Sequence, residues 1–195
     1  MKKILSLLCF AGLSLAGTAQ LNKEQQQVKK TFFDFLKFYQ RHETAFNSFR
    51  VYTGTGKENG PPYKIRWKEV ERYFSFLRKN VPYTGEAYIR SERDFFNYCD
   101  SSFKADPLEE IPVGFDYDRW AGGQESIEYT IQWYSSPGNK YEVLISGNKA
   151  VLRIGAALEA GTKEEERSWS IVPFVKEKGK WKMAGNIYPE ESPEN

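Results

Sequence analysis

Hydrophobic and polar residues alternate along much of the second half of the chain, and this period of two is typical of half-buried β-strands. In the first alternating stretch, Ile127, Ile131 and Trp133 are separated by polar residues such as Glu128 and Gln132. Segments rich in Gly, Pro, Ser and Asn separate the stretches, so we expect four or five antiparallel strands joined by tight turns. The predicted strands are 127–134, 141–145, 150–158, 168–175 and 180–188.

Turn chemistry supports this assignment. Gly147 and Asn148 both tolerate positive φ and stand between two predicted strands, which predicts a two-residue hairpin. The dipeptide 178–179, Lys-Gly, closes the last hairpin. Pro173 falls inside a predicted strand, and because proline has no N–H to donate, we expect it at a sheet edge or at a bulge.

Apolar residues recur every three or four positions in the first half of the chain, which predicts three amphipathic helices over about 23–49, 67–79 and 85–104. Asn22 and Gln25 have the spacing of a capping box at the start of the first helix. The predicted inner faces are Val28, Phe32, Phe35, Leu36, Tyr39, Phe46 and Phe49, then Trp67, Val70, Phe74 and Leu77, then Phe95 or Phe96, Cys99 and Phe103.

Two connections carry sequences that are similar to ligand-binding loops. Residues 52–64 are rich in Gly and Pro and predict a loop, but the segment 54–57 lacks the full spacing and the preceding strand of a phosphate loop. Asp116 and Asp118 are spaced as at the start of a calcium loop, yet Trp120 occupies the third ligand position. We therefore expect a structured connection there, with Trp120 packed under the sheet.

The first nineteen residues have the features of a Sec-type signal peptide. Two lysines precede an apolar run over 4–15, which is too short to span a bilayer as a helix, and the small residues Gly17 and Ala19 precede the expected cleavage site. We therefore expect a periplasmic or secreted protein that does not span the membrane. The expected divisions are a signal peptide over 1–19, a single α+β domain over 20–190 and a disordered tail over 191–195.

Removal of this signal changes the charge of the chain. The whole chain has 28 basic and 26 acidic side chains, and loss of the two lysines would leave 26 of each. Nucleic acid is therefore not an expected partner. Residues 20–83 carry +7 and residues 84–195 carry −7. This asymmetry favours either attraction between helices and sheet or a dipolar surface that steers a charged partner.

Cys99 and His42 have side chains that could serve either a structural or a chemical role. Cys99 is the one cysteine after residue 19, so an intramolecular disulfide is not expected, and its helical phase predicts a buried thiol. His42 is the chain's one histidine and falls in phase with the apolar face of the first helix. It is interpreted as a core or half-buried side chain, with a pocket acid or base as the alternative. No metal-ligand set or cofactor loop is recognisable in the sequence.

The element order, three helices followed by an antiparallel sheet, resembles the nuclear-transport-factor-two-like superfamily, also described as cystatin-like α+β. The resemblance implies a cone, in which a curved sheet of four to six strands wraps the long first helix, and a further strand near 112–115. A Gln start after the signal, and the irregular connection over 105–124, are similar to small secreted Bacteroidota domains of unknown function. The superfamily includes isomerases, dehydratases and many non-catalytic binders, and its enzymes commonly place an Asp/His or Tyr/Asp pair in the cone.

Three function classes follow from these observations. The first is a non-catalytic small-molecule-binding or accessory protein, favoured because no nucleophile–base motif is present. The second is a small-molecule enzyme of isomerase or dehydratase type that uses the cone, and the third is an inhibitor or immunity-type protein that binds a partner. The oligomeric state is not predicted. The candidate pocket residues are His42, Tyr73, Tyr88, Asp118 and Trp120, and no catalytic residue, metal or cofactor is assigned.

Overall fold

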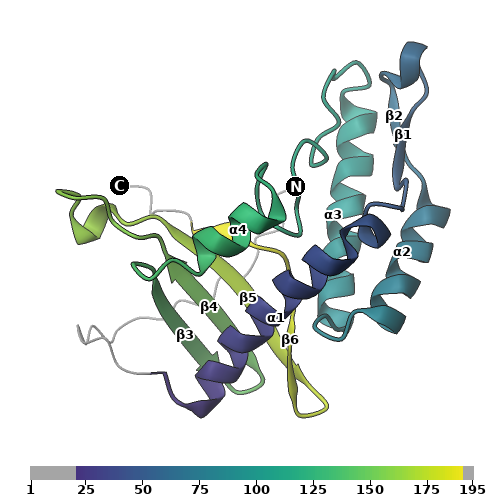
Figure 1. Cartoon of the computed structure of the whole chain (residues 1–195). Helices are drawn as coiled ribbons and strands as arrows, with labels where there is room; N and C mark the ends of the chain where they lie inside the picture. Colours follow the sequence, from purple (N-terminus) through teal and green to yellow (C-terminus); the bar gives the residue numbers. More distant parts are fainter. Residues whose placement is uncertain (1–20, 191–195) are drawn as a thin grey trace.

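The computed structural model describes residues 21–190 and has an α+β architecture (Figure 1). The predicted signal peptide and the predicted tail lie outside the described residues. The elements are α1 (Lys23–Phe46), β1 (Tyr52–Gly54), η1 (Lys57–Asn59), β2 (Tyr63–Ile65), α2 (Trp67–Asn80), α3 (Glu86–Ala105), α4 (Ile127–Tyr134), β3 (Lys140–Ser146), β4 (Lys149–Gly155), η2 (Glu164–Glu166), β5 (Trp169–Glu177), β6 (Lys180–Met183) and β7 (Tyr188–Pro189).

The main sheet is antiparallel, with the order β3-β4-β5-β6 and with β7 paired to β5 beside β6. The predicted two-residue hairpin is confirmed, because Ser146 pairs with Lys149 and Gly147 has φ +59°. β5 is an interior strand, and its Pro173 accepts a hydrogen bond from the Ala184 backbone N–H at 2.8 Å. The N and C=O of one strand residue point to the same side. The N of Pro173 therefore faces the gap between β6 and β7. On that side no described strand pairs with β5 at this point, so the lack of an N–H breaks no hydrogen bond between strands.

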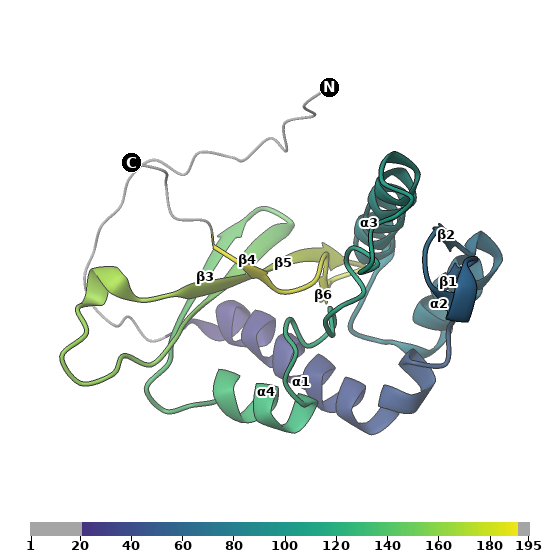
Figure 2. The same ribbon diagram turned by 90° about the horizontal axis from the view of Figure 1, so that it is seen from above.

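α1 crosses one face of the sheet, and α4 lies beside it on the same face (Figure 2). The capping box predicted at Asn22 and Gln25 is present, and the apolar face of α1 is buried as predicted. Burial of this apolar stripe against the sheet is the main driving force for the helix to form there. The sheet contributes Val143, Leu152, Ile154, Val172, Phe174 and Met183 to the same core.

α2, α3 and the β1–β2 hairpin gather at the C-terminal end of α1, beside the sheet (Figure 1). They meet the end of the sheet, where the Met183 backbone N–H donates to the Tyr83 carbonyl at 2.8 Å and Glu177 of β5 accepts from the Glu86 and Ala87 backbone N–H groups at 3.4 and 3.3 Å. The prediction of three helices packed on the sheet is therefore wrong for α2 and α3. The sheet is also not strongly curled. α1 ends at Phe46, three residues before the predicted end.

The predicted strand over 127–134 is wrong, because this segment is the helix α4. The Ser126 hydroxyl accepts a hydrogen bond from the Tyr129 N–H and caps the helix. Ile127, Thr130 and Tyr134 are buried at helical spacing, which gives the segment an inner face as well as its alternating pattern.

Three smaller expectations also fail. Residues 52–64 are not a loop, because β1 and β2 form an antiparallel hairpin there with η1 between them. No strand forms over 112–115 in the described structure. Trp120 does not pack under the sheet. Its ring instead lies 5.6 Å from Tyr39 and 5.4 Å from Phe46 of α1, and 6.0 Å from Tyr73 of α2. The aromatic side chain of this segment therefore packs on α1 and α2.

Candidate ligand-binding pocket

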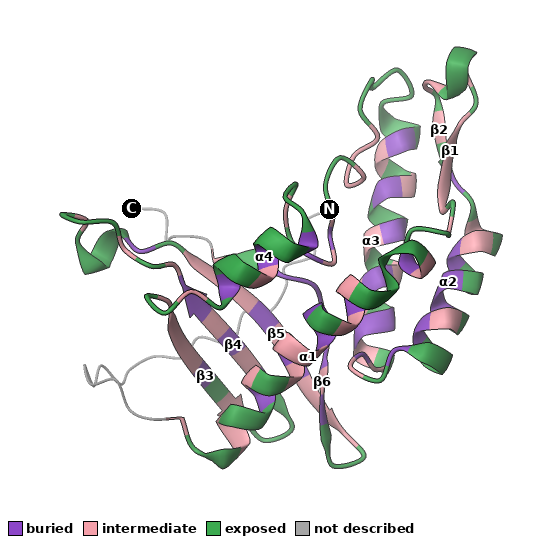
Figure 3. Ribbon diagram, viewed as in Figure 1, coloured by how far each residue is buried: buried purple, intermediate pink, exposed green. Residues whose placement is uncertain are grey.

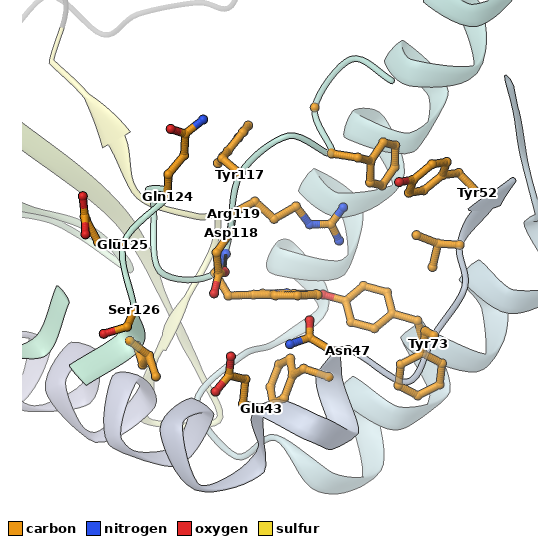
Figure 4. A pocket seen from close by; sticks show the side chains of 17 residues that line it. Glu43, Asn47, Tyr52, Tyr73, Tyr117, Asp118, Arg119, Gln124, Glu125 and Ser126 are labelled. Carbon is orange, nitrogen blue, oxygen red and sulfur yellow. Dashed lines mark hydrogen bonds between the residues drawn. The ribbon is translucent and has the colours of Figure 1, made fainter. Parts of the chain in front are cut away.

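A pocket of about 470 Å³ lies where the end of α1, the start of β1, α2 and the connection before α4 meet (Figure 4). This volume is in the range of about 300–1,000 Å³ that is usual for small-molecule sites. Seven aromatic side chains contribute to its wall: Phe46, Phe49, Tyr52, Tyr73, Phe115, Tyr117 and Trp120. Tyr52 and Phe115 lie only 4.3 Å apart between ring centres, so one side of the wall is a nearly continuous aromatic surface.

Asp118 fixes the connection that forms one side of the pocket. Its carboxylate accepts hydrogen bonds from the Tyr39 hydroxyl at 2.6 Å and from the backbone N–H groups of Trp120 and Ala121 at 2.9 and 3.0 Å. Gly122 turns the chain at φ +78°, where an added Cβ would lie 2.9 Å from the Ile187 side chain. These hydrogen bonds give Asp118 a structural role in holding the connection, and that role requires no calcium ion.

A buried ion pair lies behind the aromatic wall. Arg119 donates to Glu92 at 2.5 Å, and these side chains are 6% and 2% exposed. The Tyr73 hydroxyl donates to the same Glu92 oxygen at 2.7 Å, and Asn186 donates to the other oxygen at 2.9 Å. The Trp120 indole N–H in turn donates to the Tyr73 hydroxyl at 2.8 Å. Burial, together with the charge of Glu92, raises the pKa of Tyr73 well above its ordinary value, so this hydroxyl stays a hydrogen-bond donor.

Arg119 also lines the pocket and retains one unpaired donor. In the described part of the chain its buried Nε atom has no hydrogen-bond partner. The guanidinium is held between aromatic rings, 4.6 Å from Phe95, 4.7 Å from Phe96 and 5.0 Å from Trp120. A buried donor without a partner costs free energy, and because this Nε has almost no exposed area, an acceptor would meet it only if the rings around it moved.

The remaining polar groups of the pocket are exposed. Glu43 and Asn47 come from the end of α1, and Gln124, Glu125 and Ser126 come from the segment that leads into α4. Figure 4 shows Gln124, Glu125 and Ser126 on one side of the pocket, opposite Tyr52 and Tyr73. The pocket thus combines aromatic walls with carboxylate and amide groups that reach solvent.

The structure brings three of the five candidate residues together, because Tyr73, Asp118 and Trp120 all line this pocket. Tyr88 does not line it. This residue is fully buried, and its hydroxyl donates to the Asn186 side chain behind Glu92. His42 does not line it either, and the expectation of a core or half-buried histidine is wrong. Its ring is exposed, stacks on Phe38 at 4.0 Å, and contacts the Phe38 carbonyl through Nδ1 at 2.8 Å.

Cys99 is buried as predicted, and it lies on the inner face of α3. Burial raises the pKa of its thiol to about 12, and the sulfur lies 3.4 Å from the Val113 carbonyl oxygen. A thiol in this state is a poor nucleophile, because the reactive thiolate is not populated near neutral pH.

No family model matches the chain, and neither a curated protein nor a solved structure is significantly similar to it. Among residues 21–190, no helix is long and apolar enough to cross a membrane. Within the same range, no group of three or more His, Cys, Asp or Glu side chains is arranged to hold a metal ion.

Proposed function

We propose that this chain is an exported protein that binds a small organic molecule in the aromatic pocket and leaves it chemically unchanged. The observation that carries the proposal is the pocket itself, whose aromatic walls are combined with a few polar groups of fixed position. Such a lining is typical of small-molecule sites. Export is supported by the N-terminal sequence pattern.

The partners of the ionisable groups favour binding over catalysis. Asp118 is engaged by the Tyr39 hydroxyl and two backbone N–H groups, and Arg119 is paired with Glu92. A general acid or base must reach the proton that it transfers. Among the described lining residues, only Glu43 and Glu125 are exposed carboxylates.

One observation favours an enzyme as the second candidate. Tyr39 and Asp118 form a Tyr/Asp pair, with the hydroxyl 2.6 Å from the carboxylate, and the superfamily that the sequence resembles uses such pairs. Tyr39 is fully buried and does not line the pocket, however, and burial followed by the Asp118 hydrogen bond raises its pKa. The pair therefore serves better as a structural support than as an acid or base.

Membership of the nuclear-transport-factor-two-like superfamily is also a proposal. It is supported by a long first helix that lies across an antiparallel sheet. The pocket lies at the end of that helix, but no residue of the described main sheet lines it, so it is not the opening between helices and curved sheet that a cone implies.

A thermal-shift screen of small molecules tests the proposal. Gln124→Trp places a bulky ring in the pocket from an exposed position, and Asn97→Trp on the exposed face of α3 is the matched control. We expect a compound that raises the melting temperature of the wild type and of Asn97→Trp but not of Gln124→Trp, and that is recovered intact by mass spectrometry. Conversion of that compound, lost in Glu43→Gln or Glu125→Gln, would instead identify an enzyme. If the compound binds Gln124→Trp as tightly as it binds the wild type, the aromatic pocket is not its binding site and the proposal is wrong.

A further inference from the structure

The outer face of α4 carries two exposed aromatic side chains beside the pocket. Tyr129 is 52% exposed and Trp133 is 37% exposed, although each is large and largely apolar. They are four residues apart, so they stand on one face of the helix, about 6 Å apart along its axis. Figure 3 shows exposed as well as buried stretches along α4. The core therefore does not account for these two rings.

Two hollows border these rings, and the first of them also borders the pocket. One, of about 360 Å³, lies between α4 and the preceding connection and is lined by Glu125, Tyr129 and Trp133 among others. The other, of about 380 Å³, lies on the far side of the same two rings, next to Pro137. Glu125 lines both the first hollow and the aromatic pocket. The pocket and the two hollows therefore form a row, a surface path in which neighbours share Glu125 and then the two rings.

We propose that this path binds a neutral glycan chain, with a terminal sugar in the pocket and the following sugars against Tyr129 and Trp133. The proposal rests on the function proposed above and names the chemical class of its ligand. A sugar ring has an apolar C–H face that packs on an aromatic ring, and hydroxyl groups around its edge. Exposed, rigid aromatic side chains supply contact area of this kind at low conformational cost.

The polar groups of the pocket match hydroxyls better than a charged ligand. Glu43 and Glu125 accept hydrogen bonds, and the side-chain amides of Asn47 and Gln124 both donate and accept. A hydroxyl can serve all of these groups because it is both donor and acceptor. An ammonium group has no acceptor for the Asn47 and Gln124 N–H groups, and an anionic sugar would meet the two exposed glutamates.

The length of the path favours a chain of sugars over a single one. A ligand confined to the pocket would leave Tyr129, Trp133 and both hollows unused. A second copy of this chain is the competing occupant of an exposed aromatic face. Hollows on either side of the rings, with a carboxylate at the junction to the pocket, fit a narrow, hydroxylated chain.

Titration calorimetry with neutral oligosaccharides of increasing length, built from glucose, mannose or xylose, tests the inference. We expect one series in which affinity rises with length, and in which Trp133→Ala or Tyr129→Ala removes roughly a fivefold to tenfold gain for the longer members. The shortest member should bind these variants and the wild type equally. Tyr98→Ala, which removes a 61% exposed ring from α3, is the matched control and should bind as the wild type does.

Three results overturn the inference, and one of them also bears on the pocket. Binding of a cationic or apolar compound in the pocket, with no oligosaccharide bound, refutes the glycan and leaves the small-molecule function standing. A fall in molar mass in solution on Trp133→Ala, measured by light scattering, would make this face a contact between copies of the chain. Glycan binding that persists in Gln124→Trp would show that the pocket does not hold the terminal sugar, which refutes the proposed function as well.

Discussion

Breaking the buried ion pair behind the pocket should be far more costly than breaking an ion pair of similar geometry at the surface. Glu92 and Arg119 are 1% and 5% exposed, and their 2.5 Å contact is part of a network with Tyr73 and Asn186. Arg119→Met retains most of the side-chain volume but leaves the Glu92 carboxylate buried without its cation. Loss of one partner of such a pair costs about 3–5 kcal/mol of unfolding free energy.

The surface pair between Arg78 and Glu86 is the matched control. Its atoms are 2.8 Å apart, but the side chains are 44% and 55% exposed, so water solvates both charges. Arg78→Met should therefore cost only about 0–1 kcal/mol. Urea unfolding of both variants, followed by circular dichroism, gives the two free energies.

A double-mutant cycle separates the ion pair from other effects of the substitution. Arg119 also contacts the rings of Phe95 and Phe96, so part of its effect is packing. Combining Arg119→Met with Glu92→Gln should restore part of the lost stability, with a coupling on the order of 1–3 kcal/mol. Equal costs for Arg119→Met and Arg78→Met, or additive losses in the double variant, would refute the reasoning.

Three further predictions concern separate parts of the fold. Cys99 should react slowly with a thiol reagent in the native protein and fully after unfolding, and Cys99→Ser should cost about 1–3 kcal/mol in urea unfolding; fast native labelling would contradict its burial. Phe35→Ala should cost roughly 3–5 kcal/mol because this ring is fully buried in the core; a loss below about 1 kcal/mol would argue against that packing. Hydrogen bonds from Arg167, and to a smaller extent from Lys140, lower the pKa of Glu164 to about 2. This exposed contact should therefore stabilise the fold above the ordinary carboxyl pKa, and its contribution should be lost as the pH falls through 2. An NMR titration in which Glu164 has an ordinary midpoint would show that the contact does not form.

The helical half could be predicted because its signals are local. The capping box at Asn22 and Gln25 and the apolar spacing of the first helix both appear in the structure. The predicted second and third helices also end within about one residue of α2 and α3, a difference that is usual between assignments. A helix needs only its own residues to form its hydrogen bonds, so short stretches of sequence carry most of the information.

Residues 127–134 show where pattern reasoning failed. Alternation of Ile127, Tyr129, Ile131 and Trp133 fits a strand, but burial of Ile127, Thr130 and Tyr134 fits a helix equally well. The Ser126 cap was a local signal for the helix. The inner face of α4 is buried because the helix packs beside α1, a contact between distant parts of the sequence that its local pattern does not reveal.

The site was predicted in part for a similar reason. Tyr73, Asp118 and Trp120 meet because the irregular connection folds back over α1 and α2. Glu92 and Arg119 were missed, although Glu92 stands in phase with the buried Ile89, Phe96 and Cys99 on α3. A charge inside an apolar stripe indicates a buried partner. Its identity depends on tertiary contacts that the sequence does not show.

The most direct test of the central claim, that a small molecule binds in the aromatic pocket, is an NMR titration of the protein with the compound found in the thermal-shift screen. The reporters are the Arg119 Nε–H and the Trp120 indole N–H, assigned with Arg119→Met and Trp120→Phe. We predict that the ligand shifts both signals, because Arg119 and Trp120 both line the pocket. If the compound saturates the protein in the titration but leaves both signals unchanged, it does not bind in the pocket, and the account is wrong.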